Sequence, residues 1–161
     1  MNYGIIRYII GKVIEIEGAF FVIPVLTALV YHEWSGLGVY VLLACLYMFA
    51  GFIMSSKEPE KKEFYAREGY VLAALAWIIM SILGAIPFVI TGDIPSMADA
   101  VFEIASGFTT TGASILASPE PLLKCNLMWR SFSHWIGGMG VLVFLIAILP
   151  SGGGGRIYIM R

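Results

Sequence analysis

Charged residues are scarce in this chain. Only 13% of its 161 residues are charged, whereas a soluble domain carries about 25%. The formal net charge is −1, so no basic field would attract nucleic acid, and we expect no such partner. Apolar residues make up 59% of the chain and give a mean hydropathy of +0.86. These values exclude a long disordered tail and predict an integral membrane protein.

Cysteine is nearly absent as well. Cys45 and Cys125 stand in different apolar segments and form no spacing typical of a metal site or a disulfide framework. We therefore expect two small packing residues, and no cofactor in this chain. The first residues, Met1 to Gly4, lack a short apolar core followed by a cleavage site, so no removable signal peptide is expected.

Long segments without charged residues predict four membrane spans, since about 20 apolar residues cross a bilayer. The first is the least regular, because its apolar part is preceded by a stretch that Lys12, Glu15 and Glu17 interrupt. Pro24 and Pro87 are expected to bend the first and third spans. The four spans are residues 19–32 (extending back through 5–16), Trp34 to Ser56, Gly69 to Gly92, and Leu122 to Leu149.

The basic residues predict the orientation, because cytoplasmic loops carry an excess of Lys and Arg. With both termini in the cytoplasm, only Lys124 and Arg130 lie outside. We expect a multi-pass protein of the cell (inner) membrane, in contact with lipid. The eight basic residues on the cytoplasmic side are then Arg7, Lys12, Lys57, Lys61, Lys62, Arg67, Arg156 and Arg161.

These spans divide the chain into four predicted regions. Residues 1–56 form an N-terminal transmembrane helix pair, and 57–67 form a charged cytoplasmic linker. Residues 68–150 hold two spans with a shorter segment between them, and 151–161 form a Gly-rich cytoplasmic tail. The glycines of the tail lack the spacing and the preceding strand of a phosphate-binding loop.

The segment between the last two spans is too short and too polar to cross a membrane. Ser96 and Asp99 form a capping signature before a short helix, Met97 to Gly107. Three threonines and Gly112 follow, and β-branched residues favour extended backbone. We expect a half-helix that enters from outside, turns, and returns as an extended strand.

This arrangement suits a cation pathway. The C-terminal end of a helix carries partial negative charge, and the carbonyls of an extended Thr-Thr-Gly strand can replace water around an ion. Gly112 permits the backbone angles that such a strand needs. The predicted fold is an all-α membrane protein with four transmembrane helices, one re-entrant pore helix and an extended filter strand.

Four sequence blocks resemble the TrkH family of the Trk/Ktr/HKT potassium transporter superfamily. They are Arg67-Glu68-Gly69, the block from Gly84 to Phe88, the block from Gly107 to Ser114, and the block from Trp129 to Gly140. The resemblance covers the whole chain and is strongest from Arg67 to Pro150.

The resemblance implies a non-enzymatic potassium transporter with four pore repeats around one pathway, of which this chain holds the first. It also implies a TrkA-like nucleotide-binding regulator in the cytoplasm. It places K⁺, the transported ion, at Thr110, Thr111 and Gly112. The implied selectivity filter consists of Thr109, Thr110, Thr111, Gly112 and Ala113.

Two charges lie closest to the expected pore wall. Glu103 on the half-helix and Arg130 on the last span would pair and support the filter, because an isolated charge there is costly. Alternatively, Arg130 extends to the outer membrane interface. The glycines that follow on the last span, from Gly137 to Gly140, are expected to provide close helix contact, with Ser133 and Gly137 in small-xxx-small spacing.

Other functions remain as alternatives. A single filter strand cannot surround an ion, so either several copies assemble or the chain is a non-conducting fragment or structural subunit of a larger transporter. More remotely, Ser114 and His134 would suit an intramembrane serine protease if they came within hydrogen-bonding distance.

Overall fold

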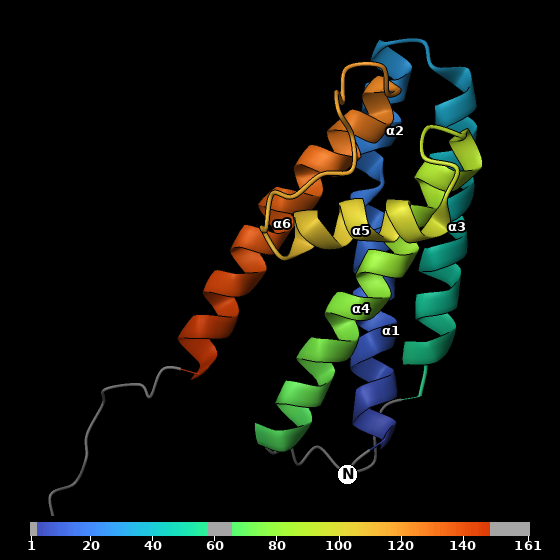
Figure 1. The fold of residues 1–161 in the computed structure, drawn as a ribbon. Helices are drawn as coiled ribbons and strands as arrows, with labels where there is room; N and C mark the ends of the chain where they lie inside the picture. The colour runs from blue at the N-terminus through green and yellow to red at the C-terminus, as the bar shows by residue number, and fades with distance from the viewer. Residues whose placement is uncertain (1–2, 58–65, 149–161) are drawn as a thin grey trace, which may run out of the picture.

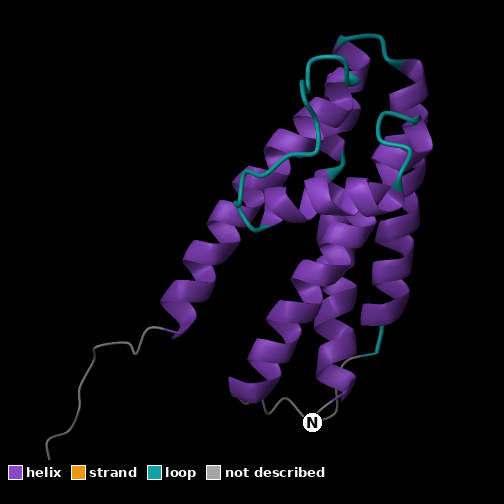
Figure 2. Ribbon diagram, in the orientation of Figure 1, coloured by secondary structure: helices purple, strands orange, loops and turns teal. Residues whose placement is uncertain are grey.

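The computed structural model describes residues 3–57 and 66–148, and within these ranges the chain is all α-helical (Figure 2). Most of the helices run along one bundle axis, while α5 lies across the others at mid-height (Figure 1). The linker residues 58–65 and the Gly-rich tail are outside the described ranges. The helices are α1 (Tyr3–Phe20), α2 (Val22–Val30), α3 (Trp34–Ser55), α4 (Ala66–Thr91), α5 (Met97–Phe108) and α6 (Lys124–Ile148).

Three helical segments have the length and the apolar composition to cross a membrane. They are Tyr3–Val30, Trp34–Ser55 and Gly69–Thr91, which confirms the first three predicted spans. The fourth prediction corresponds to α6, whose 25 residues would extend about 37 Å at 1.5 Å per residue. The side chains of residues 141–148 lie outside the described part of the structure.

The first span is interrupted at Phe21, between α1 and α2. Pro24 explains the position of this break, because it has no N–H to donate to the carbonyl four residues earlier, that of Phe20. Phe21 is fully buried and its ring packs edge-on against Trp129, with 4.7 Å between the ring centroids. The predicted bend in this span therefore seats an aromatic side chain in the core.

Pro87 lies inside α4, where it leaves the carbonyl of Leu83 without its usual helical donor. The hydroxyl of Tyr47 on α3 donates to this oxygen over 2.9 Å. On the next residue, the carbonyl of Gly84 accepts from the indole Nε1 of Trp129 on α6, also over 2.9 Å. The proline thus exposes backbone oxygens that attach α4 to two neighbouring helices.

Carboxylates from two loops hold the start of α6. The backbone N–H groups of Lys124 and Cys125 donate to Glu33 over 2.7 and 2.9 Å, and that of Leu123 donates to Asp93 over 2.9 Å. Partial burial of Glu33 opposes ionisation, but these two backbone hydrogen bonds outweigh it and lower the pKa of its carboxyl. Both acids lie where the positive end of the helix dipole favours negative charge.

The short helix α5 begins as predicted and extends one residue further. The Oγ of Ser96 accepts from the backbone N–H of Asp99 over 3.4 Å and so caps its N-terminus. Figure 1 shows the chain leaving α5 beside α6 and running along α6 toward the end of the bundle where α6 begins. This is the path of a re-entrant segment.

Candidate ion pathway at the end of helix α5

Helix α5 ends in a Schellman turn. The N–H of Thr110 donates to the carbonyl of Gly107, and the N–H of Thr111 donates to that of Ser106, each over 2.9 Å. Such a turn needs one residue in the left-handed region, and Thr110 occupies it with a φ of 56°. For a β-branched residue this conformation is strained by about 1–2 kcal/mol.

The segment after α5 forms no β-strand within the described residues. Gly112 is left-handed, with a φ of 75°, like Thr110 two residues earlier. The Schellman turn redirects the chain at Thr110, and the residues that follow it leave α5 without entering a sheet. The permissive role predicted for Gly112 fits its conformation, but no sequence signal indicates that Thr110 shares it.

Several carbonyl groups around this turn are already engaged. The carbonyl of Phe108 accepts from the indole Nε1 of Trp77 over 3.0 Å, and that of Thr109 accepts from the hydroxyl of Thr110 over 2.7 Å. Further on, the carbonyl of Ala113 accepts from the Oγ of Ser106 over 2.6 Å.

Three consecutive carbonyls remain between these engaged positions. Within the described residues, no hydrogen bond uses the carbonyl oxygens of Thr110, Thr111 or Gly112. All residues from Thr109 to Ile115 are exposed on the surface of this chain. The segment therefore combines exposed residues with backbone oxygens that lack a hydrogen-bond partner in the described chain, and it follows the negative end of α5.

Glu103 holds the returning chain in place. Its carboxylate accepts from the hydroxyl of Ser114 over 2.9 and 3.0 Å and from the backbone N–H of Ile115 over 3.0 Å. It also accepts from Nε of Arg130 on α6. The Glu103 side chain is completely buried and that of Arg130 is 18% exposed, so the arginine pairs inward rather than extending to the membrane interface.

Small residues let α5 and α6 approach closely. A Cβ built on Gly107 would lie 2.1 Å from the Oγ of Ser133, and one built on Gly137 would lie 2.3 Å from the carbonyl oxygen of Phe108. Ser133 and Gly137 therefore contact the last turn of the pore helix, which agrees with the close-contact interpretation of their spacing.

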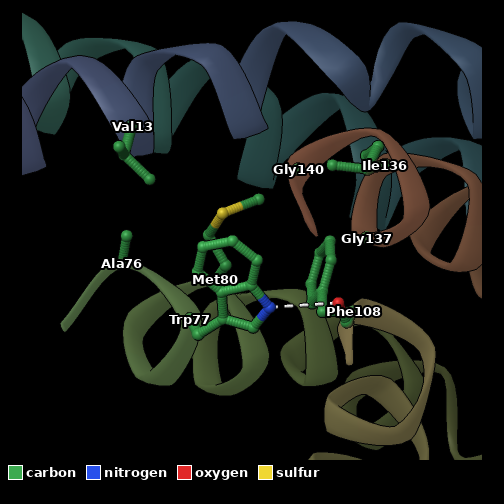
Figure 3. A pocket seen from close by; sticks show the side chains of 8 residues that line it. All are labelled: Val13, Ala76, Trp77, Met80, Phe108, Ile136, Gly137 and Gly140. Atoms are coloured by element: carbon green, nitrogen blue, oxygen red, sulfur yellow. Dashed lines mark hydrogen bonds between the residues drawn. The ribbon is translucent and has the colours of Figure 1, made fainter. Parts of the chain in front are cut away.

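A cavity of about 200 Å³ lies beside this junction, between α1, α4, α5 and α6. Figure 3 shows the indole of Trp77 on α4 hydrogen-bonded to the carbonyl of Phe108, with Gly137 of α6 beside Phe108. Val13 and Met80 also line the cavity.

The structure does not bring Ser114 and His134 together as a serine protease would require. The Oγ of Ser114 bonds to Glu103, and the Nδ1 of His134 lies 2.9 Å from the carbonyl oxygen of Arg130. No hydrogen bond joins Ser114 to His134 in the described part, so the geometry gives no support to a protease. Cys45 and Cys125 are both free. Among the described residues, no group of His, Cys, Asp and Glu could hold a metal ion.

The structure brings the five predicted filter residues and the Glu103–Arg130 pair together at one end of α5. It adds two residues that sequence reasoning missed, namely Trp77 and Ser106. Ser114 belongs to the recognised block, but its hydrogen bond to Glu103 was not predicted. Trp77 donates to the carbonyl of Phe108 and Ser106 donates to that of Ala113. No local sequence pattern indicates either contact.

Comparison with known proteins identifies similar chains. A model of the TrkH family, described as "Cation transport protein", matches residues 40–160. An uncharacterized cation transporter of Methanocaldococcus jannaschii is 36% identical over 148 residues, covering 92% of this chain and 31% of the relative. The Trk system potassium uptake protein TrkH of Escherichia coli K12 is 32% identical, covering 100% of this chain and 34% of the relative.

A further relative is the Trk system potassium uptake protein TrkG of Escherichia coli K12, which is 30% identical over 84% of this chain and 28% of its own length. The chain thus spans about a third of the length of the relatives that it matches.

Proposed function

The chain belongs to the TrkH family of cation transport proteins, and from that premise we propose that it forms one wall of a potassium uptake pathway. Members of this family are ion transporters and not enzymes, and potassium uptake is named in the relatives. The proposed transported ion is K⁺, with Thr109 to Ala113 as this chain's share of the selectivity filter.

The observation that carries the proposal is the run of three unengaged carbonyls at Thr110, Thr111 and Gly112. Carbonyl oxygens replace the hydration shell of a potassium ion in filters of this kind. Exposed polar backbone at membrane depth is tolerated only beside protein or a water-filled path. These three positions are our proposed K⁺ contacts, and the dipole of α5 supports a cation there.

Glu103 and Arg130 are proposed as filter support. The carboxylate joins the pore helix to Ser114 and Ile115 on the returning chain, and Arg130 neutralises it from α6. Removing either partner would leave the other charge unpaired in a buried place, which is strongly destabilising. The pair would therefore fix the position of the filter segment without contacting the ion.

One such wall cannot enclose an ion, and the exposed face from Thr109 to Ile115 needs further walls. We propose that other pore repeats supply them, either from further copies or from a longer chain. In this arrangement residues 68–150 form the repeat and 1–56 the preceding helix pair. A TrkA-like regulator would bind on the cytoplasmic side of the cell membrane, where both termini would lie.

The test compares two glycines with the same backbone conformation. Gly112 and Gly92 have φ values of 75° and 81°, and a Cβ built on either meets no atom within 4 Å. Alanine at each position therefore costs a similar amount in stability, but only Gly112 belongs to the filter. Each variant is purified and reconstituted into vesicles, and potassium flux is measured together with the mass of the detergent-solubilised protein.

We expect Gly112→Ala to reduce potassium flux or its selectivity over sodium, while Gly92→Ala retains both. Equal losses in the two variants would refute the filter assignment. A monomeric mass without flux in the unmodified chain would instead favour the non-conducting alternative, in which other segments must complete the pathway.

A further inference from the structure

Glu17 is an unpaired acid in the middle of the first span. Its side chain is 0% exposed, and neither carboxylate oxygen has a hydrogen-bond partner in the described part of the chain. Two residues earlier, Glu15 bonds to the Lys12 ammonium over 2.8 Å and is partly exposed. Helix α1 thus carries one carboxylate that is paired with a lysine and another that has no hydrogen-bond partner within the described residues.

The head group of Glu17 lies directly behind the pore helix. A Cβ built on Gly84 of α4 would be 3.1 Å from Oε1 of Glu17, 3.1 Å from Ile104 and 3.4 Å from Phe108. Gly84 therefore leaves the space in which the carboxyl sits, and two side chains of α5 border the same space. The acid is next to the helix that presents the filter.

Within the described part of the chain, no cation pairs with this acid. Tyr47 on α3 interacts with it electrostatically, but the hydroxyl of Tyr47 donates to the carbonyl of Leu83. The side chains of α5 nearest to the space beside Gly84 are those of Ile104 and Phe108, neither of which titrates. Arg130 is engaged with Glu103, and Lys12 with Glu15.

An ionised carboxylate is very costly in such surroundings, so an unpaired buried acid binds a proton instead. An ionised Glu17 would also lie near the C-terminal turn of α5, where the helix dipole is negative and repels an anion. The proton-bound form is therefore the one compatible with the observed packing of α5.

We propose that Glu17 is a proton-binding site behind the pore helix, and that loss of its proton loosens the packing of α5 against α4. A proton from water forms an O–H bond with the carboxylate, and no other bond changes. The cavity shown in Figure 3 lies near this acid, because Val13 and Met80 line it one helical turn from Glu17 and Gly84. Phe108 borders both spaces.

Infrared spectroscopy of the purified protein in lipid at neutral pH tests the first part. The spectrum of wild type minus Glu17→Gln should show a protonated carboxylic acid band that shifts in heavy water. Wild type minus Glu15→Gln should show only ionised carboxylate bands. Ionised carboxylate bands in the Glu17→Gln difference would overturn the proposal. A second difference spectrum, wild type minus Glu17→Met, should show the same acid band. Agreement between the two spectra makes the assignment independent of how the introduced glutamine packs.

Hydrogen exchange tests the second part and does not require transport. We expect amide exchange in α5, corrected for the intrinsic effect of pH, to rise at alkaline pH in wild type and in Glu15→Gln. In Glu17→Gln this rise should be lost. A rise of equal size in all three proteins would refute the link between the proton and the pore helix, even if potassium transport were unaffected.

Discussion

Replacing Gly137 by alanine would test whether the filter depends on the close approach of α6 to the pore helix. The new Cβ would lie 2.3, 2.7 and 2.8 Å from the oxygen, carbon and Cα of Phe108. These are backbone atoms, so no side-chain rotation relieves the overlap. Restoring ordinary contact requires the last turn of α5 and α6 to separate by about 1 Å, since well-packed carbon atoms sit at about 3.5–4.0 Å.

The neighbouring Gly138 is the matched control, because it lies on the same helix and has room. A Cβ on Gly138 would meet only Cγ2 of Thr110, at 3.9 Å. Alanine gains about 1 kcal/mol over glycine in a helix at both positions. Overpacking costs about 1–3 kcal/mol at Gly137 alone. Separation would also break the hydrogen bond from Trp77 to Phe108, worth about 1 kcal/mol.

Stability and transport should therefore separate the two variants. Summing these terms, Gly137→Ala is destabilised by about 1–3 kcal/mol, while Gly138→Ala is stabilised by up to about 1 kcal/mol. For a chain of this size, 1 kcal/mol corresponds to about 2–4 °C in Tm. Thermal unfolding in detergent gives the Tm, and potassium flux into vesicles gives the activity. Equal Tm and equal flux in the two variants would refute the reasoning.

Three other side chains give further predictions. Tyr47→Phe removes the hydroxyl from the free carbonyl of Leu83, so unfolding free energy should fall by about 1–3 kcal/mol in denaturant unfolding. Trp77→Phe removes the donor to Phe108 and should lower potassium flux more than it lowers Tm; an equal flux would contradict its positioning role. The lowered pKa of Glu33 means that its contribution to stability is present above the ordinary carboxyl value of 4.5 and is lost as pH falls through the folded-state value. Glu33→Gln should accordingly lower the Tm at neutral pH and reduce its loss on acidification, and an unchanged acid profile would count against this capping role.

Much of the fold could be predicted because its signals are local. Charge-free segments locate the spans to within a few residues, and the Ser96 cap fixes the start of α5. The bend at Pro24 was also predictable. The helix itself breaks at Phe21, because Pro24 lacks the N–H that would donate to the carbonyl of Phe20. Each of these features depends on residues within one or two turns of one another.

The filter geometry could not be predicted in the same way. Sequence rules assign left-handed backbone to glycine, so Gly112 was expected in that region and Thr110 was not. The conformation of Thr110 follows from how the last turn of α5 closes. The contact between Glu103 and Arg130 was predicted from the cost of buried charge, but the role of Ser114 in the same network depends on how far the chain turns back.

These contacts explain how an unfavourable backbone persists at the filter. Thr110 is strained, yet its N–H bonds to Gly107 and its hydroxyl to Thr109. Strain of this kind survives only where the surroundings determine the conformation, and it gathers at functional sites. Here the consequence is that three successive carbonyls have no hydrogen-bond partner within the described chain, in a segment whose residues are exposed. Such oxygens are costly at membrane depth unless protein, water or an ion satisfies them, which is the physical basis for proposing a cation pathway at this segment.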